Sequence, residues 1–260
     1  MRDVVEYGHR VLLAFEDGSH FIVSAGEDSF GTHKGVIDLS KLIGAEYGSA
    51  LETAKGEVFF VMRPRFVDDL FKMKRRTQIV YPKDMAFIIF MMDVKEGDLV
   101  IDAGVGSAAM CGALARSVGN MGRVFAYERR KDFYDIAKSN LEKWGLLDRV
   151  ELKLKDISEG FDEKVNAIFL DVPDPWNYIS NCSKALLGSG NLAIVCPTTN
   201  QVQKVIEAIE SENFIMLEIW ESLFRKYKPV SERLRPFDRM VAHTAYMIFA
   251  RKAEKRRKEI

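Results

Sequence analysis

The spacing of apolar and polar positions divides the chain into two regions. Up to about residue 60, short alternating apolar runs such as 10–18 and 19–26 are punctuated by glycine, a pattern typical of β-strands joined by turns. The residues EDGS at 16–19 separate these two runs and predict a hairpin turn. No long helical period occurs in this region, so the pattern predicts a small β domain over residues 1–72.

From Gly97 onward, strand-like apolar runs alternate with segments of helical period. The predicted strands are 99–101, 123–128, 149–156, 166–172, 190–196, 214–223 and 243–252. Two further helices are expected near Phe66 and from Asp84. This alternation predicts a Rossmann-like, doubly wound α/β sheet over residues 73–260, closed by a terminal strand pair that includes an antiparallel strand.

The stretch from Leu99 to Ala115, LVIDAGVGSAAMCGALA, organises this second domain. Gly104 and Gly106 permit a sharp turn after the strand and leave room for a ligand beside the backbone. A helix expected from about Ser107 directs its free N–H groups back toward that turn. Such an arrangement binds a nucleotide-like cofactor at the carboxyl edge of the sheet.

The acidic residue ahead of the turn separates two possible cofactors. The spacing Gly104-x-Gly106-x-x-Ala109 also fits the dinucleotide fingerprint, so the glycines alone leave a nicotinamide-dependent oxidoreductase open. Asp102 stands two residues before the first glycine, where its charge would oppose a pyrophosphate. It suits a cationic, amino-bearing ligand without phosphates, which favours S-adenosylmethionine (SAM).

Acidic residues also follow the next three strands, whose carboxyl ends meet at the same edge of the sheet. Glu128 has the spacing expected of a carboxylate that accepts hydrogen bonds from ribose hydroxyls, and Asp156 is a candidate acceptor for the amine of adenine. Asp171 opens the hexapeptide DVPDPW, which two prolines stiffen. Methylating a ring nitrogen requires alignment and no covalent intermediate. Asp171 is the candidate to accept a hydrogen bond from the base's exocyclic amine and to favour positive charge on the ring.

The composition is that of an ordinary soluble globular protein, with 47% hydrophobic and 29% charged residues among 260. Its 38 basic and 38 acidic residues cancel, which argues against a globally basic nucleic-acid binder. Basic residues nevertheless concentrate at 63–83, 225–239 and 251–260, where they either neutralise phosphates or form solvated faces.

Two classes of site are not expected. The three cysteines lack the spacing of a zinc site, so no metal is predicted. No apolar run is long enough to cross a membrane, and the N-terminus lacks the apolar core of a signal peptide. We therefore expect a cytoplasmic protein with no membrane partner.

Five segments together resemble the tRNA (adenine-N1)-methyltransferase family, which forms 1-methyladenosine at position 58 of the T-loop. They are RRTQIVYPKD, DAGVGSAAM, AYERR, DVPDPW and RPFDRMVAHTAYMIFARK, within 75–252. The resemblance implies a SAM-dependent enzyme that acts on tRNA, a small N-terminal domain that helps hold tRNA, and a homotetramer. It also implies that Gln78 and Tyr81 flank the cofactor and target-base pocket.

Residue reasoning and resemblance together give the expected site. The residues assigned to SAM are Gln78, Asp102, Gly104, Gly106, Ser107, Glu128, Asp156 and Asp171. The residues assigned to catalysis are Asp171 and Tyr81.

The sequence departs from the family pattern within the glycine turn. Ala108 replaces the usual third glycine and Val105 replaces a common threonine, which bears on cofactor affinity. Alanine tolerates helical dihedrals, so we expect the turn to survive with little loss. Archaeal relatives also methylate adenosine 57, and the sequence leaves that choice open. A non-catalytic tRNA-binding subunit is a further alternative, against which the retained glycines, Glu128 and Asp171 argue.

Overall fold

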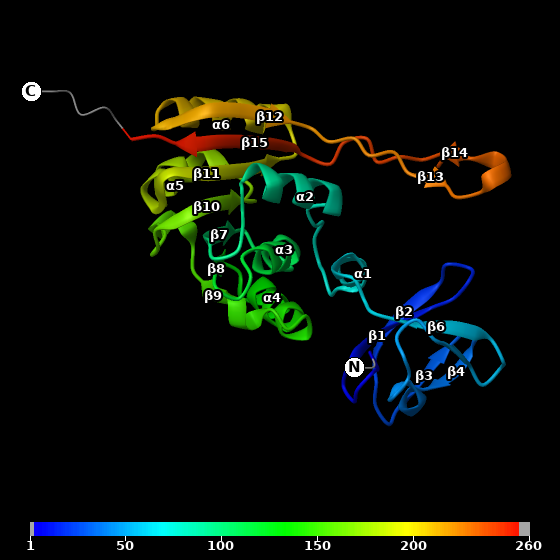
Figure 1. Cartoon of the computed structure of the whole chain (residues 1–260). Helices are drawn as coiled ribbons and strands as arrows, with labels where there is room; N and C mark the ends of the chain where they lie inside the picture. The colour runs from blue at the N-terminus through cyan, green and yellow to red at the C-terminus, as the bar shows by residue number, and fades with distance from the viewer. Residues whose placement is uncertain (1–2, 255–260) are drawn as a thin grey trace, which may run out of the picture. The chain divides into compact units, whose positions relative to one another are not determined.

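The computed structural model describes residues 3–254 and divides into two compact units, Met1–Met73 and Lys74–Ile260 (Figure 1). The expected boundary lay between residues 72 and 73. The basic stretch 251–260 falls mostly outside the described residues. Within residues 3–254, no helix is long and apolar enough to cross a membrane.

The N-terminal unit consists mainly of antiparallel strands. Its elements are β1 (Arg10–Ala14), β2 (His20–Ser24), β3 (Ser29–Thr32), β4 (Gly35–Asp38), β5 (Ala50–Glu52), β6 (Val58–Met62) and α1 (Phe66–Lys72). The strands pair in the order β2-β1-β6-β5, with β3 and β4 as a separate hairpin. The turn predicted at 16–19 joins β1 to β2, and Gly18 adopts the positive φ of 83° that this turn requires. Alternate residues such as Val11, Leu13 and Val61 point into one apolar core.

The C-terminal unit is built around a seven-stranded sheet in the order β12-β15-β11-β10-β7-β8-β9. Its strands are β7 (Leu99–Ala103), β8 (Arg123–Glu128), β9 (Val150–Leu154), β10 (Val165–Leu170), β11 (Leu186–Cys196), β12 (Phe214–Trp220) and β15 (Tyr246–Lys252). Its helices are α2 (Pro82–Met91), α3 (Ala109–Ser117), α4 (Lys131–Lys143), α5 (Ile179–Ala185) and α6 (Thr199–Glu210). Strands β7 to β11 are parallel to one another and β15 is antiparallel to β11 and β12, which confirms the predicted fold class.

The order of the strands determines where a ligand can bind. From β7 the chain continues to β8 on one side, and β10 later pairs with β7 on the other side. Helices α2, α3 and α4 lie on one face of the sheet, and α5 and α6 lie on the other (Figure 1). Because the winding reverses between β7 and β10, their carboxyl ends flank an opening that helices do not cover. Buried Ile101 and Ile168 support this edge from within the core.

Between β12 and β15 the chain leaves the sheet as an extended arm, residues 221–245 (Figure 1). It carries two short antiparallel strands, β13 (Tyr227–Lys228) and β14 (Arg235–Pro236). The exposed large apolar residues of the arm are Leu223, Phe224, Tyr227, Val230, Leu234, Phe237, Met240 and Val241. A surface of this kind is typical of a contact with another protein surface.

Both ends of the arm are bound to the start of α2. The Asp84 carboxylate, 2% exposed, accepts hydrogen bonds from the hydroxyls of Ser222 (2.6 Å) and Thr244 (2.8 Å). Lys83 donates to the same two hydroxyls at 2.8 Å and pairs with Asp84 at 2.8 Å. Lys83 belongs to the basic stretch 63–83, but its ammonium group is bound by Asp84, Ser222 and Thr244. The expectation of a phosphate contact is therefore wrong for this residue.

Candidate active site

Gly104 lies where two strand ends touch. It has a φ of 91°, and a Cβ atom built on it would lie 1.9 Å from the carbonyl oxygen of Asp171. The Asp171 N–H in turn donates to the carbonyl of Ala103 at 2.9 Å. No side chain can be accommodated at position 104, because the backbone after β10 crosses directly over it. The glycine therefore fixes the distance between the ends of β7 and β10.

Gly106 has a different role, because a Cβ atom there would meet no steric clash, its nearest neighbours being 3.9 Å away or more, although its φ of 55° is one that side chains rarely adopt. Its N–H donates to Glu128 Oε2 at 3.0 Å, and the Arg130 N–H donates to Glu128 Oε1 at 2.9 Å. These two bonds hold the Glu128 carboxylate, which is 7% exposed, in one orientation. A carboxylate has about four acceptor positions, so Glu128 can accept further hydrogen bonds from a ligand.

The turn ends in a strained residue. Ala108 has φ 66° and ψ 23°, the left-handed conformation, which costs a non-glycine residue about 1–2 kcal/mol. The expectation that Ala108 adopts ordinary helical dihedrals is therefore wrong. The helix begins only at Ala109, and the buried methyl group of Ala108 is surrounded by the core.

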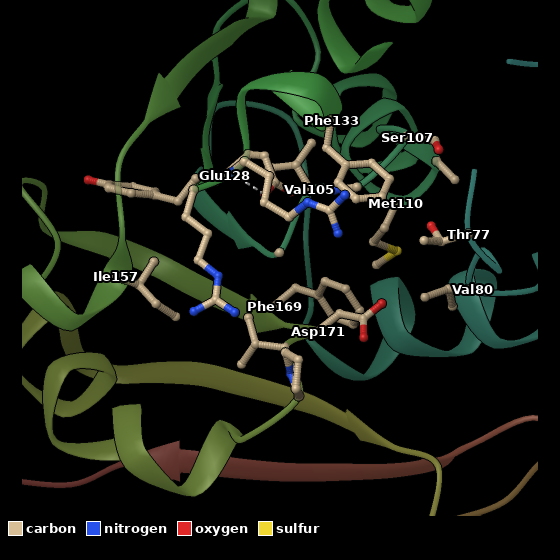
Figure 2. Close-up of a pocket in the computed structure, with 18 of the residues that line it drawn as sticks. Thr77, Val80, Val105, Ser107, Met110, Glu128, Phe133, Ile157, Phe169 and Asp171 are labelled. Atoms are coloured by element: carbon tan, nitrogen blue, oxygen red, sulfur yellow. Dashed lines mark hydrogen bonds between the residues drawn. The ribbon is translucent and has the colours of Figure 1, made fainter. Parts of the chain in front are cut away.

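A cavity of about 400 Å³ opens at this edge, a size that suits a small-molecule ligand (Figure 2). Its wall is formed by the glycine turn, by the ends of β8 and β10, and by residues 77–80 of the segment 74–81, here called the strap. The expected site residues on the wall are Gln78, Gly104, Gly106, Ser107, Glu128, Asp156 and Asp171. Asp102 and Tyr81 are not part of the wall: Asp102 lies behind the turn and Tyr81 is the residue that precedes α2.

Asp171 reaches the cavity from the end of β10, and its carboxyl group points toward the side of the strap (Figure 2). Burial among surrounding protein atoms raises the pKa of Asp171 to about 6, although its surface is open to the cavity. Near neutral pH the group is therefore an anion that gains much from a hydrogen-bond donor. Such a carboxylate is well suited to accept a hydrogen bond from the amine of a base.

Asp102 is the most deeply buried acid of the site, with 1% exposure. Burial, followed by the charges of Asp171 and Glu128, raises the pKa of Asp102 to about 8. Neither of its oxygens meets a donor in hydrogen-bonding geometry within residues 3–254. The neighbouring Cys111 is also buried, and the pKa of its thiol is raised by burial and by Asp102. Asp102 is therefore neutral near pH 7, unlike the charged group assumed from the sequence.

Asp156, which follows β9, also lines the cavity. Its carboxylate accepts from the Ser158 N–H at 2.9 Å, and this bond holds the pKa of Asp156 below its ordinary value. Arg129 pairs with its second oxygen at 3.6 Å. The acceptor proposed for an adenine amine is thus ionised and oriented.

Several wall residues were not anticipated from the sequence. They are Thr77, Val105, Met110, Arg129, Arg130, Phe133, Ile157 and Phe169. Most are apolar or belong to loops whose direction no periodicity reveals. The two arginines directly follow Glu128 and belong to the segment AYERR, so their place after a strand-end acid and the family resemblance were the available signals.

The residues present fit SAM. Gly106 leaves room beside the backbone, Glu128 has acceptor capacity for ribose hydroxyls, and the Ser107 hydroxyl has no partner within the described residues. The acids Glu128, Asp156 and Asp171 line the cavity. The arginines on the wall are paired with acids: Arg129 with Asp156 and Arg130 with Asp132. This donor set favours a nucleoside that carries positive charge over one that carries phosphates.

Comparisons with known proteins agree with this geometry. A family model described as tRNA methyltransferase complex GCD14 subunit matches residues 67–234. The chain is 33% identical over 267 residues to tRNA (adenine(57)-N(1)/adenine(58)-N(1))-methyltransferase TrmI of Methanocaldococcus jannaschii, covering 92% of this chain and 94% of that protein.

Two solved structures are similar over almost the whole chain. The tRNA (m1A58) methyltransferase TrmI of Aquifex aeolicus has a TM-score of 0.84 and 33% identity, covering 97% of this chain and 100% of that one. A protein described as a SAM-dependent O-methyltransferase from Thermotoga maritima has a TM-score of 0.92 and 57% identity, covering 98% of this chain and 96% of that one.

Proposed function

The chain belongs to the family described as tRNA methyltransferase complex GCD14 subunit, and from this membership we propose that it transfers a methyl group from SAM to N1 of adenosine 58 in the T-loop of tRNA. The observation that carries the proposal is Asp171, a carboxylate at the end of β10 that faces the cavity beside Glu128 and the glycine turn. Methyl transfer from a sulfonium to a ring nitrogen requires no metal ion, and we propose none.

The wall residues divide between holding the cofactor and holding the base. Gly106, Ser107 and Glu128 bind the ribose side of SAM, Asp156 accepts from the adenine amine, and Gln78 closes the cavity from the strap. When bound, SAM supplies an electrophilic methyl group on a sulfonium. Asp102 is buried and neutral, and its carboxyl group has no hydrogen-bond partner within residues 3–254.

Asp171 acts on the target base. Its carboxylate accepts a hydrogen bond from the exocyclic N6–H group and so directs the N1 lone pair toward the methyl group. As N1 forms its new bond, the adenine ring becomes positively charged, and the adjacent anion stabilises that charge. With a pKa near 6, Asp171 can also receive the N6 proton afterwards. Tyr81, which precedes α2 and is not on the cavity wall, is assigned to the base only by the family resemblance.

The test is to treat an unmodified tRNA transcript with SAM and the purified protein, and to locate the methylated nucleoside by mass mapping. We expect 1-methyladenosine at position 58. A second product at position 57 would resemble the activity named for the M. jannaschii relative. A 2′-O-methylated ribose would instead follow the description of the T. maritima structure and would reject N1 methylation. Absence of product with the chain alone would support a non-catalytic subunit, and binding of NAD in place of SAM would support an oxidoreductase.

We also propose a homotetramer. The apolar side chains of the arm, which include Leu223 at 61% and Leu234 at 69% exposure, favour burial against another copy. Light scattering of the parent and of a Leu223→Ser, Leu234→Ser double variant tests this: the parent should be tetrameric and the variant smaller. A parent that is monomeric at micromolar concentration rejects the assembly.

The N-terminal unit is proposed to assist tRNA binding, and the enzyme is proposed to work in the cytoplasm because its substrate is tRNA. Residues 1–73 form their own core, so the unit contributes a surface and leaves the cavity to residues 74–260. Comparing tRNA affinity and SAM affinity for the full chain and for residues 74–260 tests the role. Equal tRNA affinity for both would reject it.

A further inference from the structure

One buried side chain of α4 is polar where the pattern calls for an apolar residue. The face of α4 that packs inward carries Phe133, Ala137, Asn140 and Leu141. Asn140 is 2% exposed and carries no charge. A buried amide destabilises the folded protein unless its polar atoms form hydrogen bonds.

Both N–H groups of the Asn140 amide are directed at backbone carbonyls from two different segments. Nδ2 donates to the carbonyl of Lys74 at 2.9 Å and to the carbonyl of Ser107 at 3.0 Å. Lys74 begins the strap, and Ser107 belongs to the glycine turn. Since the strap residues Thr77 to Val80 and Ser107 line the cavity, one side chain connects two of its walls.

The Ser107 carbonyl needs this donor because of the backbone that follows it. Ala108 is left-handed, and the first backbone bond at the start of α3 runs from the Gly112 N–H to the Ala108 carbonyl, one residue later. The Ser107 carbonyl is therefore turned out of the helix, toward α4. Without Asn140, the Ser107 carbonyl would lose this hydrogen-bond donor. The strap would also lose its connection to the glycine turn.

We propose that Asn140 is a positioning residue for the cofactor: its amide holds the strap at a fixed distance from the glycine turn and so keeps the SAM cavity in its binding shape. Asn140 itself is not on the cavity wall. The inference rests on the proposed function only in naming SAM as the ligand. It assigns to Asn140 an effect on cofactor affinity, carried through the backbone of Ser107 and of the strap.

The test uses Asn140→Asp, which keeps the shape of the side chain but removes both donors. We expect the Kd for SAM, measured by calorimetry, to rise about tenfold or more, since two hydrogen bonds that shape the cavity are lost. The KM for SAM should rise in parallel, whereas kcat at saturating SAM should stay within about threefold. Asn140→Gln, which retains an amide, should recover part of the affinity.

A second readout follows the strap directly. The strap contains Lys74, Arg75 and Arg76, so trypsin can cut it. We expect faster cleavage there in Asn140→Asp than in the parent, under conditions in which the rest of the unit stays intact, and we expect SAM to slow that cleavage in the parent. If Asn140→Asp does not fold, Asn140→Gln alone decides, with an expected rise in Kd of about threefold.

Asn191→Asp is the matched control, because Asn191 donates to the carbonyl of Met92 at 2.9 Å and does not line the cavity. It should lose stability with no change in the Kd for SAM. Folded Asn140→Asp with the parent's Kd and trypsin rate would overturn the proposal. A parent protein that does not bind SAM at all would instead reject the proposed function.

Discussion

At the carboxyl end of β8, the Glu128 carboxylate is fixed by backbone hydrogen bonds beside the cavity, whereas on the arm, residues 221–245, large apolar side chains face outward. Glu128 accepts from two backbone N–H groups, and Asp171 is surrounded by protein although it faces the cavity. Phe224, in contrast, is 66% exposed. The cavity is lined by residues of this chain, and the exposed apolar side chains of the arm are suited to contact a partner.

This contrast separates the region that would carry out methyl transfer from the regions that would bind a large substrate. A methyl transfer requires alignment within a few tenths of an ångström, which a rigid parallel sheet provides. Binding of a folded RNA requires a long reach and phosphate contacts. Under the proposed function, the extended arm and the exposed arginines are the regions expected to supply them. Variants of the cavity should therefore change catalysis or SAM affinity, and variants of exposed cations should change tRNA affinity alone.

The largest effect is expected at Asp171. Asp171→Ala removes the group that orients the base and stabilises charge on the ring, so turnover should fall by about two or more orders of magnitude. SAM binding should survive in part, because Glu128 and the glycine turn remain. Single-turnover methylation with calorimetry checks both. Near-parental turnover would show that the cavity does not act through this residue.

The next effect concerns the cofactor. Glu128→Ala removes acceptors for ribose hydroxyls and also releases the N–H groups of Gly106 and Arg130. Charged hydrogen bonds contribute about 1.5–3 kcal/mol, so SAM affinity should fall roughly tenfold to hundredfold. Saturating SAM should restore much of the rate. Unchanged affinity by calorimetry would remove Glu128 from the cofactor site.

The third effect is on the pH profile. Burial raises the pKa of Asp171 to about 6, so the acceptor is ionised above that pH and becomes protonated as the pH falls through it. The value of kcat/KM should therefore drop about tenfold per pH unit below pH 6. Asp171→Asn has no proton to gain there, and its residual activity should lack this acid limb. An identical limb in that variant would assign the titration to another group.

Much of this division was readable from the sequence. Strand β8 has the predicted bounds, because its apolar run is closed by Arg123 and Glu128 at the two ends. The glycine turn and the acids that follow the strands were found because spacing alone places them at one edge of the sheet. The terminal strand pair, with its antiparallel strand, was predicted from the apolar runs 214–223 and 243–252.

The remainder depends on tertiary neighbours that spacing does not encode. Ala108 is left-handed because the turn must redirect the chain into α3, against the preference of alanine. Asp102 lies behind the wall, and burial changes its charge. Lys83 was grouped with exposed cations, but Asp84 and the ends of the arm surround it. The environments of Asp102 and Lys83 are set by residues far away in the sequence.

The smallest effect tests the grip on tRNA. Arg75 and Arg76 lie on the strap, and Arg76 pairs with Asp132 at 3.3 Å with 66% of its side chain exposed. An exposed pair of this kind contributes at most about 1 kcal/mol, so a phosphate can replace Asp132. The double variant Arg75→Gln, Arg76→Gln should weaken tRNA binding a few-fold. It should also flatten the slope of log K against log salt by about 1.5, with SAM affinity unchanged.

The control is Lys95→Gln with Arg123→Gln, which removes the same charge at the amino ends of β7 and β8, away from the cavity edge. A matching change in the control would mean that net charge alone governs tRNA affinity. A second comparison replaces Arg225 and Arg233 on the arm, both exposed, by Gln. If the arm pair flattens the slope and the strap pair leaves it unchanged, phosphate contacts belong to the arm. The arginines of the strap are then only a solvated segment beside the cavity.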